Sequence, residues 1–416
     1  DLKTPELSFF ERLLKSTGER EISTTQALVQ AMTLLCRDEK LGPRIVPIVP
    51  DEARTFGMEG MFRQIGIYAH EGQKYEPVDR EQLMYYREDQ KGQFLQEGIN
   101  EDGAISSWIA AATSYSNSGI QMIPFYTFYS MFGFQRVGDL IWAAGDIQAR
   151  GFLIGGTSGR TTLNGEGLQH EDGQSQIMAA NVPNCISYDP TFAYELMVII
   201  QNGLKRMFEN QENVFYYITT LNENYPHPEM KKGQEENIIK GMYLFQQGGK
   251  GSKRVQLMGS GSILREVIAA ANILSEDFGI QADVWSCPSF NELKRDGDDC
   301  VRWNLMHPDQ KPRIPHVTAC LEKHSGPVVA ATDYVKLFAD QIRAYVGRNY
   351  HVLGTDGFGR SDTRASLRRH FEVNRYYVTV AALKTLADEG TIPAKTVKSA
   401  IRKYKLDPEK PNPLNV

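Results

Sequence analysis

Short runs of apolar and β-branched residues alternate along this chain with longer segments in which apolar residues recur at helical spacing. In the first half, the runs that predict strands are residues 44–49, 121–126, 151–155, 184–188 and 213–219. The segments that predict helices are residues 107–115, 138–150 and 191–208. Because strands that alternate with helices pair in parallel through β-α units, this half is expected to be an α/β domain with a doubly wound, mostly parallel sheet.

A polar stretch at residues 222–237, which includes Pro226 and Pro228, interrupts this pattern and is interpreted as a linker. Beyond it, the strand pattern returns at residues 254–258, 282–286, 327–331 and 351–354, and the helix pattern at residues 264–274, 374–386 and 394–405. The sequence therefore predicts two α/β domains, residues 1–230 and residues 231–416.

The charge is distributed unevenly between these two predicted domains. Residues 1–225 carry 18 Lys and Arg against 29 Asp and Glu, a net charge of −11, whereas residues 226–416 carry 28 against 22, a net charge of +6. The overall charge of −5 gives no general attraction to nucleic acid. Hydrophobic residues make up 41% of the chain and charged residues 23%, which is typical of a folded globular protein and excludes wholesale disorder.

Neither a membrane nor a secretory class is expected from the sequence pattern. A membrane helix needs about 18 or more consecutive apolar residues, and no run approaches that length. The first residues have no signal-peptide pattern. The five cysteines include no C-x-x-C pair and are an odd number for a disulfide framework, so a reducing cytoplasm is the expected location.

Several short motifs have ordinary structural explanations. Gly259-Ser260-Gly261-Ser262 is an incomplete dinucleotide fingerprint, and a tight strand-to-helix turn is the preferred interpretation over a cofactor site. No two of the eight histidines have the spacing of a zinc site, so no dedicated metal site is expected within the chain. The cluster Arg364, Arg368, Arg369 and His370 has helical spacing and is interpreted as a solvated basic face, with an acidic partner as the alternative.

Glu101 is the first candidate for chemistry. It lies in Gly98-Ile-Asn-Glu101-Asp-Gly103, directly before a helical segment of small residues. The amides of a helix start favour an anion, and a close-packed wall would remove water from the carboxyl group, which together tune an acid for proton transfer. From this segment alone, however, a purely helix-capping acid is the preferred interpretation.

Two further segments have a composition that is unusual for segments with a purely structural role. Residues 125–134 contain six aromatic residues just after a predicted strand, where α/β sheets bind ligands and where a flat aromatic wall would suit a heteroaromatic ring. Residues 155–173 form a long, polar, glycine-rich strand exit with His170 near its end.

These segments together resemble one family. The resemblance is close in Pro50-Asp-Glu52-Ala-Arg-Thr-Phe-Gly, Glu97-Gly-Ile-Asn-Glu101, Tyr129-Ser-Met-Phe132-Gly-Phe-Gln-Arg136, Leu163-Asn-Gly-Glu-Gly-Leu-Gln-His170-Glu-Asp-Gly and Asp356-Gly-Phe-Gly-Arg-Ser-Asp. The family is the homodimeric, bacterial-type first component of the pyruvate dehydrogenase complex, a thiamine diphosphate-dependent enzyme with a transketolase-like fold. The resemblance implies a pyrimidine-binding middle domain at residues 1–230 and a transketolase-like C-terminal domain at residues 231–416.

Residue by residue, the resemblance implies roles for five side chains. Glu101 matches the glutamate that hydrogen-bonds the aminopyrimidine ring nitrogen, a role that needs a partly protonated acid with a raised pKa. Phe132 matches the aromatic residue against that ring. Tyr129 and His170 match side chains that reach the substrate-derived group, and Glu52 has a supporting role. Glu166 and Arg136 match the same motifs without an implied role.

The resemblance also implies parts that this chain does not contain. The family holds Mg²⁺ through an upstream Gly-Asp-Gly motif, which is absent here, and Asp296-Gly297-Asp298 is no substitute. The chain is therefore expected to be about half of the enzyme and to be inactive or nearly so alone. The implied partners are a second copy, pyruvate, and the lipoyl group of the dihydrolipoyl acetyltransferase component. Another transketolase-like enzyme acting on a different 2-oxo acid or a sugar phosphate, or a non-catalytic assembly module, are the alternatives.

Overall fold

The computed structural model describes residues 2–50, 53–76, 78 and 86–416, and these form two compact units. The first unit contains Asp1–Ser158, Met178–Ser187 and Phe192–Met230, and the second contains Gly159–Ile177, Tyr188–Thr191 and Lys231–Val416. Two short segments from before residue 230 thus belong to the second unit. The predicted domain division between residues 230 and 231 stays a prediction.

The first unit is built on a six-stranded sheet in the order β4-β1-β5-β6-β8-β7. Its strands are β1 (Ile45–Val49), β4 (Leu95–Gln96), β5 (Ile123–Tyr129), β6 (Phe152–Gly156), β7 (Cys185–Tyr188) and β8 (Phe215–Thr219). The pairings of β1 with β4 and β5, of β5 with β6, and of β6 with β8 are all parallel. A separate pair, β2 (Ile67–Tyr68) and β3 (Glu88–Asp89), is parallel as well.

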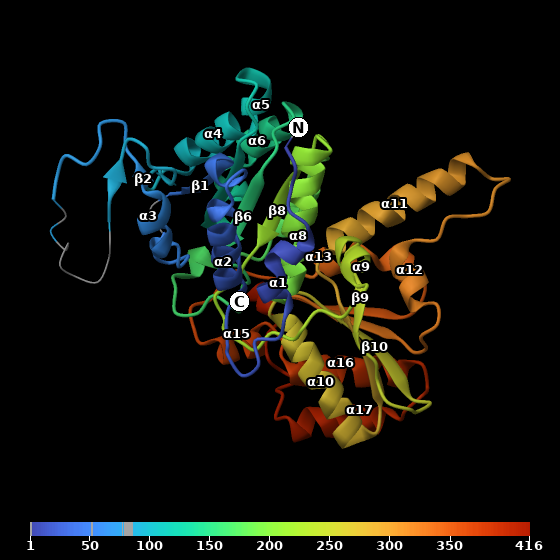
Figure 1. Ribbon diagram of the computed structural model, residues 1–416. Coiled ribbons are helices and arrows are strands. Elements are labelled where there is room, and N and C mark those ends of the chain that lie inside the picture. Colours follow the sequence, from blue (N-terminus) through green and yellow to red (C-terminus); the bar gives the residue numbers. More distant parts are fainter. Residues whose placement is uncertain (1, 51–52, 77, 79–85) are drawn as a thin grey trace. The chain divides into compact units, whose positions relative to one another are not determined.

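Helices cover both faces of this sheet. They are α1 (Glu11–Leu14), α2 (Thr24–Arg37), α3 (Glu59–Ile65), α4 (Glu101–Ala112), α5 (Ser114–Asn117), α6 (Phe134–Asp146), α8 (Ala193–Leu204) and, across the division between the units, α7 (Ser175–Ala180). In Figure 1, α2 lies beside α8, and α4 lies beside α6. Ser23 caps α2 with a reciprocal bond from Gln26, so the start of this helix is set by its own sequence.

The second unit is built on a five-stranded sheet in the order β13-β12-β10-β11-β9. The strands are β9 (Tyr243–Gln246), β10 (Arg254–Gly259), β11 (Gln281–Ser286), β12 (Val328–Ala331) and β13 (Tyr350–Leu353). All described pairs are parallel except the edge strand β9, which runs antiparallel to β11 with a register shift between Val284 and Trp285. The expected α/β class with two mostly parallel sheets is thus confirmed.

The helices of the second unit are α9 (Glu235–Ile239), α10 (Ile263–Phe278), α11 (Phe290–Met306), α12 (His316–Leu321), α13 (Leu337–Asp340), α14 (Arg343–Val346), α15 (Arg364–His370), α16 (Arg375–Asp388) and α17 (Ala394–Lys403). In Figure 1, α10, α16 and α17 lie together on one side of the sheet, and α11 extends away from it. Gly279 ends α10 in the left-handed conformation, with φ of 63°, which glycine adopts without a steric penalty.

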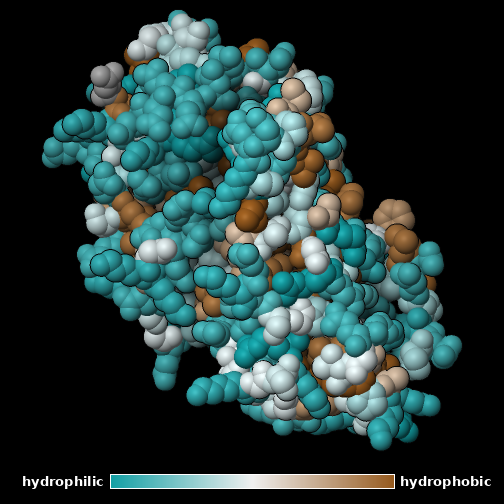
Figure 2. Space-filling model, turned by 90° about the vertical axis from the view of Figure 1, so that its right-hand side faces the viewer, coloured by the Kyte–Doolittle hydropathy of each residue, from teal (hydrophilic) through white to brown (hydrophobic). Residues whose placement is uncertain are grey.

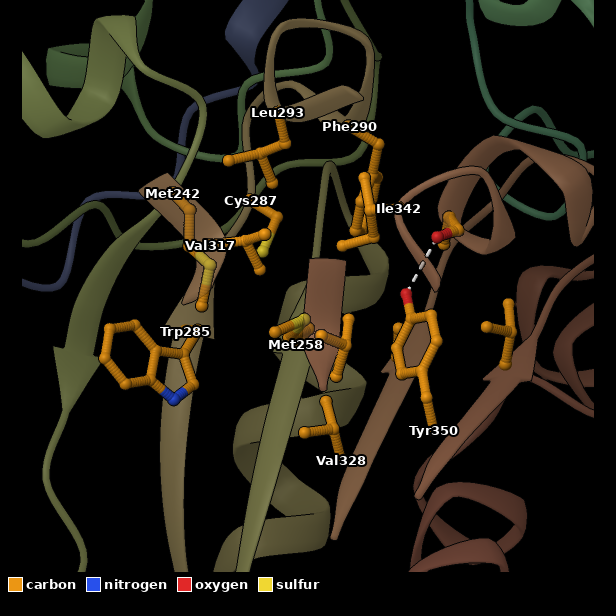
Figure 3. Close-up of a cluster of buried hydrophobic side chains, with 14 of the residues drawn as sticks. Met242, Met258, Trp285, Cys287, Phe290, Leu293, Val317, Val328, Ile342 and Tyr350 are labelled. Atoms are coloured by element: carbon orange, nitrogen blue, oxygen red, sulfur yellow. Dashed lines mark hydrogen bonds between the residues drawn. The ribbon is translucent and has the colours of Figure 1, made fainter. Parts of the chain in front are cut away.

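A cluster of buried side chains forms the core on the other side of this second sheet (Figure 3). Met258 and Val328 from the strands meet Phe290 and Leu293 from α11 in this cluster. The hydroxyl of Tyr350 donates to the backbone oxygen of Ala339 at 2.8 Å, so the polar atom of a buried ring is satisfied. Burial raises the pKa of this tyrosine well above its usual value.

The surface facing the viewer in Figure 2 is mostly hydrophilic, and hydrophobic residues lie scattered over it. A local group of exposed apolar side chains surrounds the end of α11 and includes Val301, Leu305, Met306 and Ile314. Within the part of the chain that the structure describes, every helix is too short or too polar to span a lipid bilayer.

Most predicted strands are confirmed within a few residues, but one interpretation of a polar segment is wrong and another needs detail. The stretch from residue 222 contains the change from the first unit to the second, after Met230, yet its first part is packed, because Tyr225 and His227 are buried and stack at 4.8 Å within the first unit. The basic cluster is no solvated face, because Arg368 is 6% exposed and donates to the hydroxyl of Thr161. In both cases a polar side chain is buried because distant residues supply its hydrogen bonds.

Candidate active site

The candidate residues of the first unit lie at the carboxyl edge of its sheet. Glu101 begins α4, which follows β4, and Tyr129 is the last residue of β5. Phe132 ends the short 3₁₀ turn Ser130–Phe132 that continues β5. The carboxyl ends of parallel strands share one edge, which is where open α/β sheets bind their ligands.

The carboxylate of Glu101 is not the cap of its helix. Asn100 performs that function, since its side chain accepts a hydrogen bond from the backbone N–H of Gly103 at 3.1 Å. Glu101 instead accepts a hydrogen bond from Nη1 of Arg136 at 2.8 Å, and its side chain is only 12% exposed. Its carboxylate is therefore held by a residue of α6, away from the helix axis.

Arg136 joins two of the predicted residues. Its guanidinium group lies 3.9 Å from the centre of the Phe132 ring while it pairs with Glu101. A guanidinium group is attracted to the negative face of an aromatic ring, so this contact also orients the ring. The sequence assigned Arg136 no role, and only the tertiary contact reveals one. The structure thus brings Glu101 and Phe132 into contact with a single cation.

Tyr129 and Phe132 form an aromatic wall at the same place. Their ring centres are 5.9 Å apart and tilted by 69°, and Tyr129 also contacts Phe56 at 5.5 Å. The turn depends on Gly133, because a Cβ atom there would lie 2.1 Å from the Phe128 ring. Glycine is therefore required by close packing, and it fixes the path of the chain that carries Phe132.

Several buried hydroxyl groups near these strand ends lack a partner within the described residues. They belong to Tyr126, Thr127, Ser130, Thr157 and Thr220. Burial, with the charge of Glu101 as a smaller cause, raises the pKa of Tyr126, so its hydroxyl stays protonated. Thr157 has a φ of 48°, an uncommon conformation for a β-branched residue. Unpaired buried hydroxyls and local backbone strain are concentrated at functional sites more often than in structural cores.

His170 belongs to the second unit, where it ends the 3₁₀ turn Leu168–His170 with its Nδ1 atom buried. Glu171, which follows it, is 0% exposed and accepts a hydrogen bond from the backbone N–H of Arg360 at 2.9 Å. Burial raises the pKa of Glu171 to about 8. The sequence did not identify Glu171, since its role depends on the distant loop at Arg360. Glu52 lies outside the described residues, and Glu166 is half-buried.

The glycine turn after β10 is no ligand site in this structure. The hydroxyl of Ser260 donates to Asp189 at 2.8 Å, and the hydroxyl groups of Ser262 and Thr162 are bonded to one another. These contacts fill the turn with the chain's own side chains, in agreement with the interpretation as a tight connection. Within the described ranges, no group of three or more His, Cys, Asp or Glu side chains is placed to hold a metal ion.

The residues of the first unit fit the aminopyrimidine ring of thiamine diphosphate. A carboxylate of low exposure, an aromatic face and unpaired buried hydroxyls converge at one sheet edge. An aminopyrimidine ring has two flat faces and ring nitrogens that need hydrogen bonds, and these groups match both needs.

The fold belongs to a known class. The structure resembles the transketolase of Leishmania mexicana with a TM-score of 0.67 at 15% identity, covering 92% of this chain and 48% of that one. It resembles the transketolase of Campylobacter jejuni with a TM-score of 0.64 at 15% identity, covering 90% and 49%. The chain therefore has a transketolase-like α/β fold.

Sequence comparisons identify the family within this class. Residues 6–228 match the model of the pyruvate dehydrogenase E1 component middle domain, and residues 241–374 match the transketolase-like C-terminal domain. The chain is 62% identical to a pyruvate dehydrogenase E1 component of Cupriavidus necator, covering 100% of this chain and 47% of that protein. It is 63% identical to one of Pseudomonas aeruginosa, covering 99% and 47%. The chain belongs to the family of pyruvate dehydrogenase E1 components, and it spans about half the length of these curated relatives.

Proposed function

We propose that this chain supplies the pyrimidine side of the thiamine diphosphate site in a pyruvate dehydrogenase (acetyl-transferring) component. The observation that carries the proposal is the Glu101 carboxylate held beside the Phe132 ring at the carboxyl edge of a parallel sheet. The names of the relatives support pyruvate as the substrate. When bound, thiamine diphosphate supplies the electron sink for decarboxylation.

The chain's own residues bind, orient and exchange protons with this ring. The carboxyl group of Glu101 hydrogen-bonds a ring nitrogen and shares a proton with it, and Phe132 packs against the ring face. The positive charge of Arg136 offsets that of the carboxylate and fixes its direction. Tyr129 and His170 donate hydrogen bonds or protons to the substrate-derived group, and Glu52 supports the site.

The remaining parts of the function involve other molecules. We propose that the acetyl group is transferred to the lipoyl group of the dihydrolipoyl acetyltransferase component, and that the active form is a homodimer. The relatives extend beyond the matched C-terminal part, and that additional length is proposed to hold the diphosphate through Mg²⁺. No Mg²⁺ ligand is assigned within this chain.

The test is Glu101→Gln in the full-length enzyme, with Asp102→Asn as the matched control in the same helical turn. Gln can still hydrogen-bond but cannot share a proton, so turnover should fall by roughly 10² to 10⁴. Asp102 is exposed and should leave turnover near the wild-type value. Turnover and melting temperature are measured on the same preparations. A near-normal turnover for Glu101→Gln with a lowered melting temperature would return Glu101 to a structural role.

The isolated chain is expected to bind thiamine diphosphate weakly or not at all. It contains no Gly-Asp-Gly motif, so the diphosphate would lack its magnesium ligands. Calorimetric titration with thiamine diphosphate, with and without Mg²⁺, tests this expectation. Tight binding that depends on Mg²⁺ would contradict it and would require a metal site within these residues.

A further inference from the structure

Residues 159–174, here called the histidine segment because they include His170, belong to the second unit. They are bound by a loop from the C-terminal part of the chain. Arg160 is 4% exposed and makes most of these bonds. Its Nη1 atom donates to the backbone oxygens of Thr355 at 2.6 Å and Gly357 at 2.5 Å. Its Nε atom donates to the backbone oxygen of Glu171 at 3.3 Å. One buried cation thus ties the histidine segment to residues 354–360, here called the clamp loop.

The side chain of Glu171 provides a second tie between the same two segments. Its Oε2 atom accepts the bond from the N–H of Arg360, while its Oε1 atom has no hydrogen-bond partner within the described residues. Burial raises its pKa, with the charge of Asp333 acting in the same direction and that of Arg160 opposing it. A buried acid with an unpaired oxygen carries a desolvation cost that a buried apolar side chain does not. Packing alone does not explain the choice of an acid.

The third tie is a close approach of the two backbones. A Cβ atom on Gly359 would lie 2.3 Å from the backbone oxygen of Leu168 and 2.9 Å from the Cβ atom of Glu171. Gly359 does not have a positive φ, so this glycine is required by proximity and not by backbone conformation. The clamp loop therefore contacts the residues on both sides of His170 in sequence.

We propose that Glu171 and Gly359 are positioning residues that hold the His170 side chain in its working direction. The C-terminal domain would then have a specific function, which is to act as a rigid template for a side chain used in the reaction. This inference rests on the proposed function only for the role of His170 itself. The positioning of His170 can be tested without turnover, because histidine reactivity reports the exposure of the ring.

The direct test measures the rate at which diethyl pyrocarbonate modifies His170 in this chain, resolved by peptide mass spectrometry at one fixed pH. His70, which is exposed in the first unit, is the internal reference. Glu171→Ala and Gly359→Ala should each raise the His170 rate several-fold. Glu171→Gln should restore a near wild-type rate, because the amide oxygen still accepts the bond from Arg360. If Glu171→Ala does not fold, Gly359→Ala still decides the outcome.

Two controls separate positioning from general damage. Asp283→Asn removes a buried acid of the same unit that bonds Arg254 and His324 at the opposite end of the sheet. It should lower the melting temperature and leave the His170 rate unchanged. Gly60→Ala, at a position in α3 with open space around it, should leave the His170 rate unchanged and keep or slightly raise the melting temperature. The proposal is overturned if both clamp variants leave the His170 rate at the wild-type value, or if Asp283→Asn raises it equally.

A second arm uses the full-length enzyme. Glu171→Ala should lower kcat and leave the affinity for thiamine diphosphate unchanged, because the pyrimidine contacts come from the first unit. His170→Ala provides the reference for complete loss of this side chain. If His170→Ala keeps full turnover, the catalytic role in the proposed function fails. The modification rates then still decide whether the clamp loop positions the ring.

Discussion

The carboxyl edges of the two sheets differ in whether their buried serine and threonine hydroxyl groups have hydrogen-bond partners. At the edge of the first unit, the buried hydroxyls of Ser130, Thr157 and Thr220 have no partner within the described residues. At the edge of the second, Ser260 and Ser262 bond Asp189 and Thr162 of the same unit. Two sheets of similar architecture therefore differ in the polar groups that they leave available to a ligand, and this difference comes from their loops.

The second unit fills its own edge by recruiting residues from an early part of the chain. Asp333, at the end of β12, accepts hydrogen bonds from the N–H of Thr161 at 2.9 Å and from its hydroxyl at 2.6 Å. It accepts a third from the hydroxyl of Thr162 at 2.5 Å. The donors of Thr161 and Thr162 are thus matched by an acceptor of the same unit. The structural function of this edge is to hold the histidine segment.

The substitution Asp333→Ala is expected to have the largest effect on the difference between the two edges. In Asp333→Ala, three buried donors lose their acceptor, and the free energy of unfolding should fall by about 3–5 kcal/mol. Asp309→Ala is the control, since Asp309 is exposed and should change stability by less than about 0.5 kcal/mol. Urea unfolding of both variants provides the measurement. A loss below about 1 kcal/mol for Asp333→Ala would mean that the second edge is not held by these bonds.

A smaller effect is expected for Glu171→Gln, which should change how the free energy of unfolding depends on pH. Burial raises the pKa of Glu171 from 4.5 in its ordinary state to about 8 in the folded chain, near Arg160, Asp333 and the backbone of Arg360. Between these two values the unfolded chain loses a proton that the folded chain keeps, so wild-type stability falls as the pH rises from about 4.5 to about 8. Gln does not titrate. The free energy of unfolding of the variant relative to the wild type should therefore increase by on the order of 2 kcal/mol between pH 5 and pH 8.5.

Unfolding at pH 5, 6.5 and 8.5 measures this difference, with Glu276→Gln as the control. Glu276 is an exposed acid of α10, and its replacement should give a nearly constant difference from the wild type at all three values. Equal pH profiles for Glu171→Gln and the wild type would show that Glu171 is ionised in the folded chain already at pH 5.

Periodicity was sufficient to predict most strands, since a buried parallel strand is a short apolar run between turn residues. It placed the end of β5 too early, because Thr127 and Tyr129 look polar in sequence although they continue the strand. It could not predict that residues 159–177 belong to the second unit. That association depends on bonds between Arg160 and Thr355, which are nearly two hundred residues apart and have no local signature.

The candidate site was likewise predictable from the sequence only in part. Family resemblance pointed to Glu101, Phe132, Tyr129 and His170, and their roles stay predictions. Composition alone could not choose between a capping and a chemical role for Glu101, and the structure shows that Asn100 is the cap. The contact of Arg136 with both Glu101 and Phe132 arises from the packing of α6 beside α4, which no spacing rule encodes.

The smallest expected effect compares one serine from each edge directly. Ser260→Ala removes a hydroxyl that donates to Asp189, so it should cost about 1–2 kcal/mol of unfolding free energy. Ser130→Ala removes a buried hydroxyl without a partner within the described residues, so it should change stability by less than about 0.5 kcal/mol or raise it slightly. Both serines are nearly fully buried, which makes the two substitutions matched in volume and environment. Equal losses in urea unfolding would mean that the first edge is as fully satisfied as the second, and it would remove the main structural distinction between them.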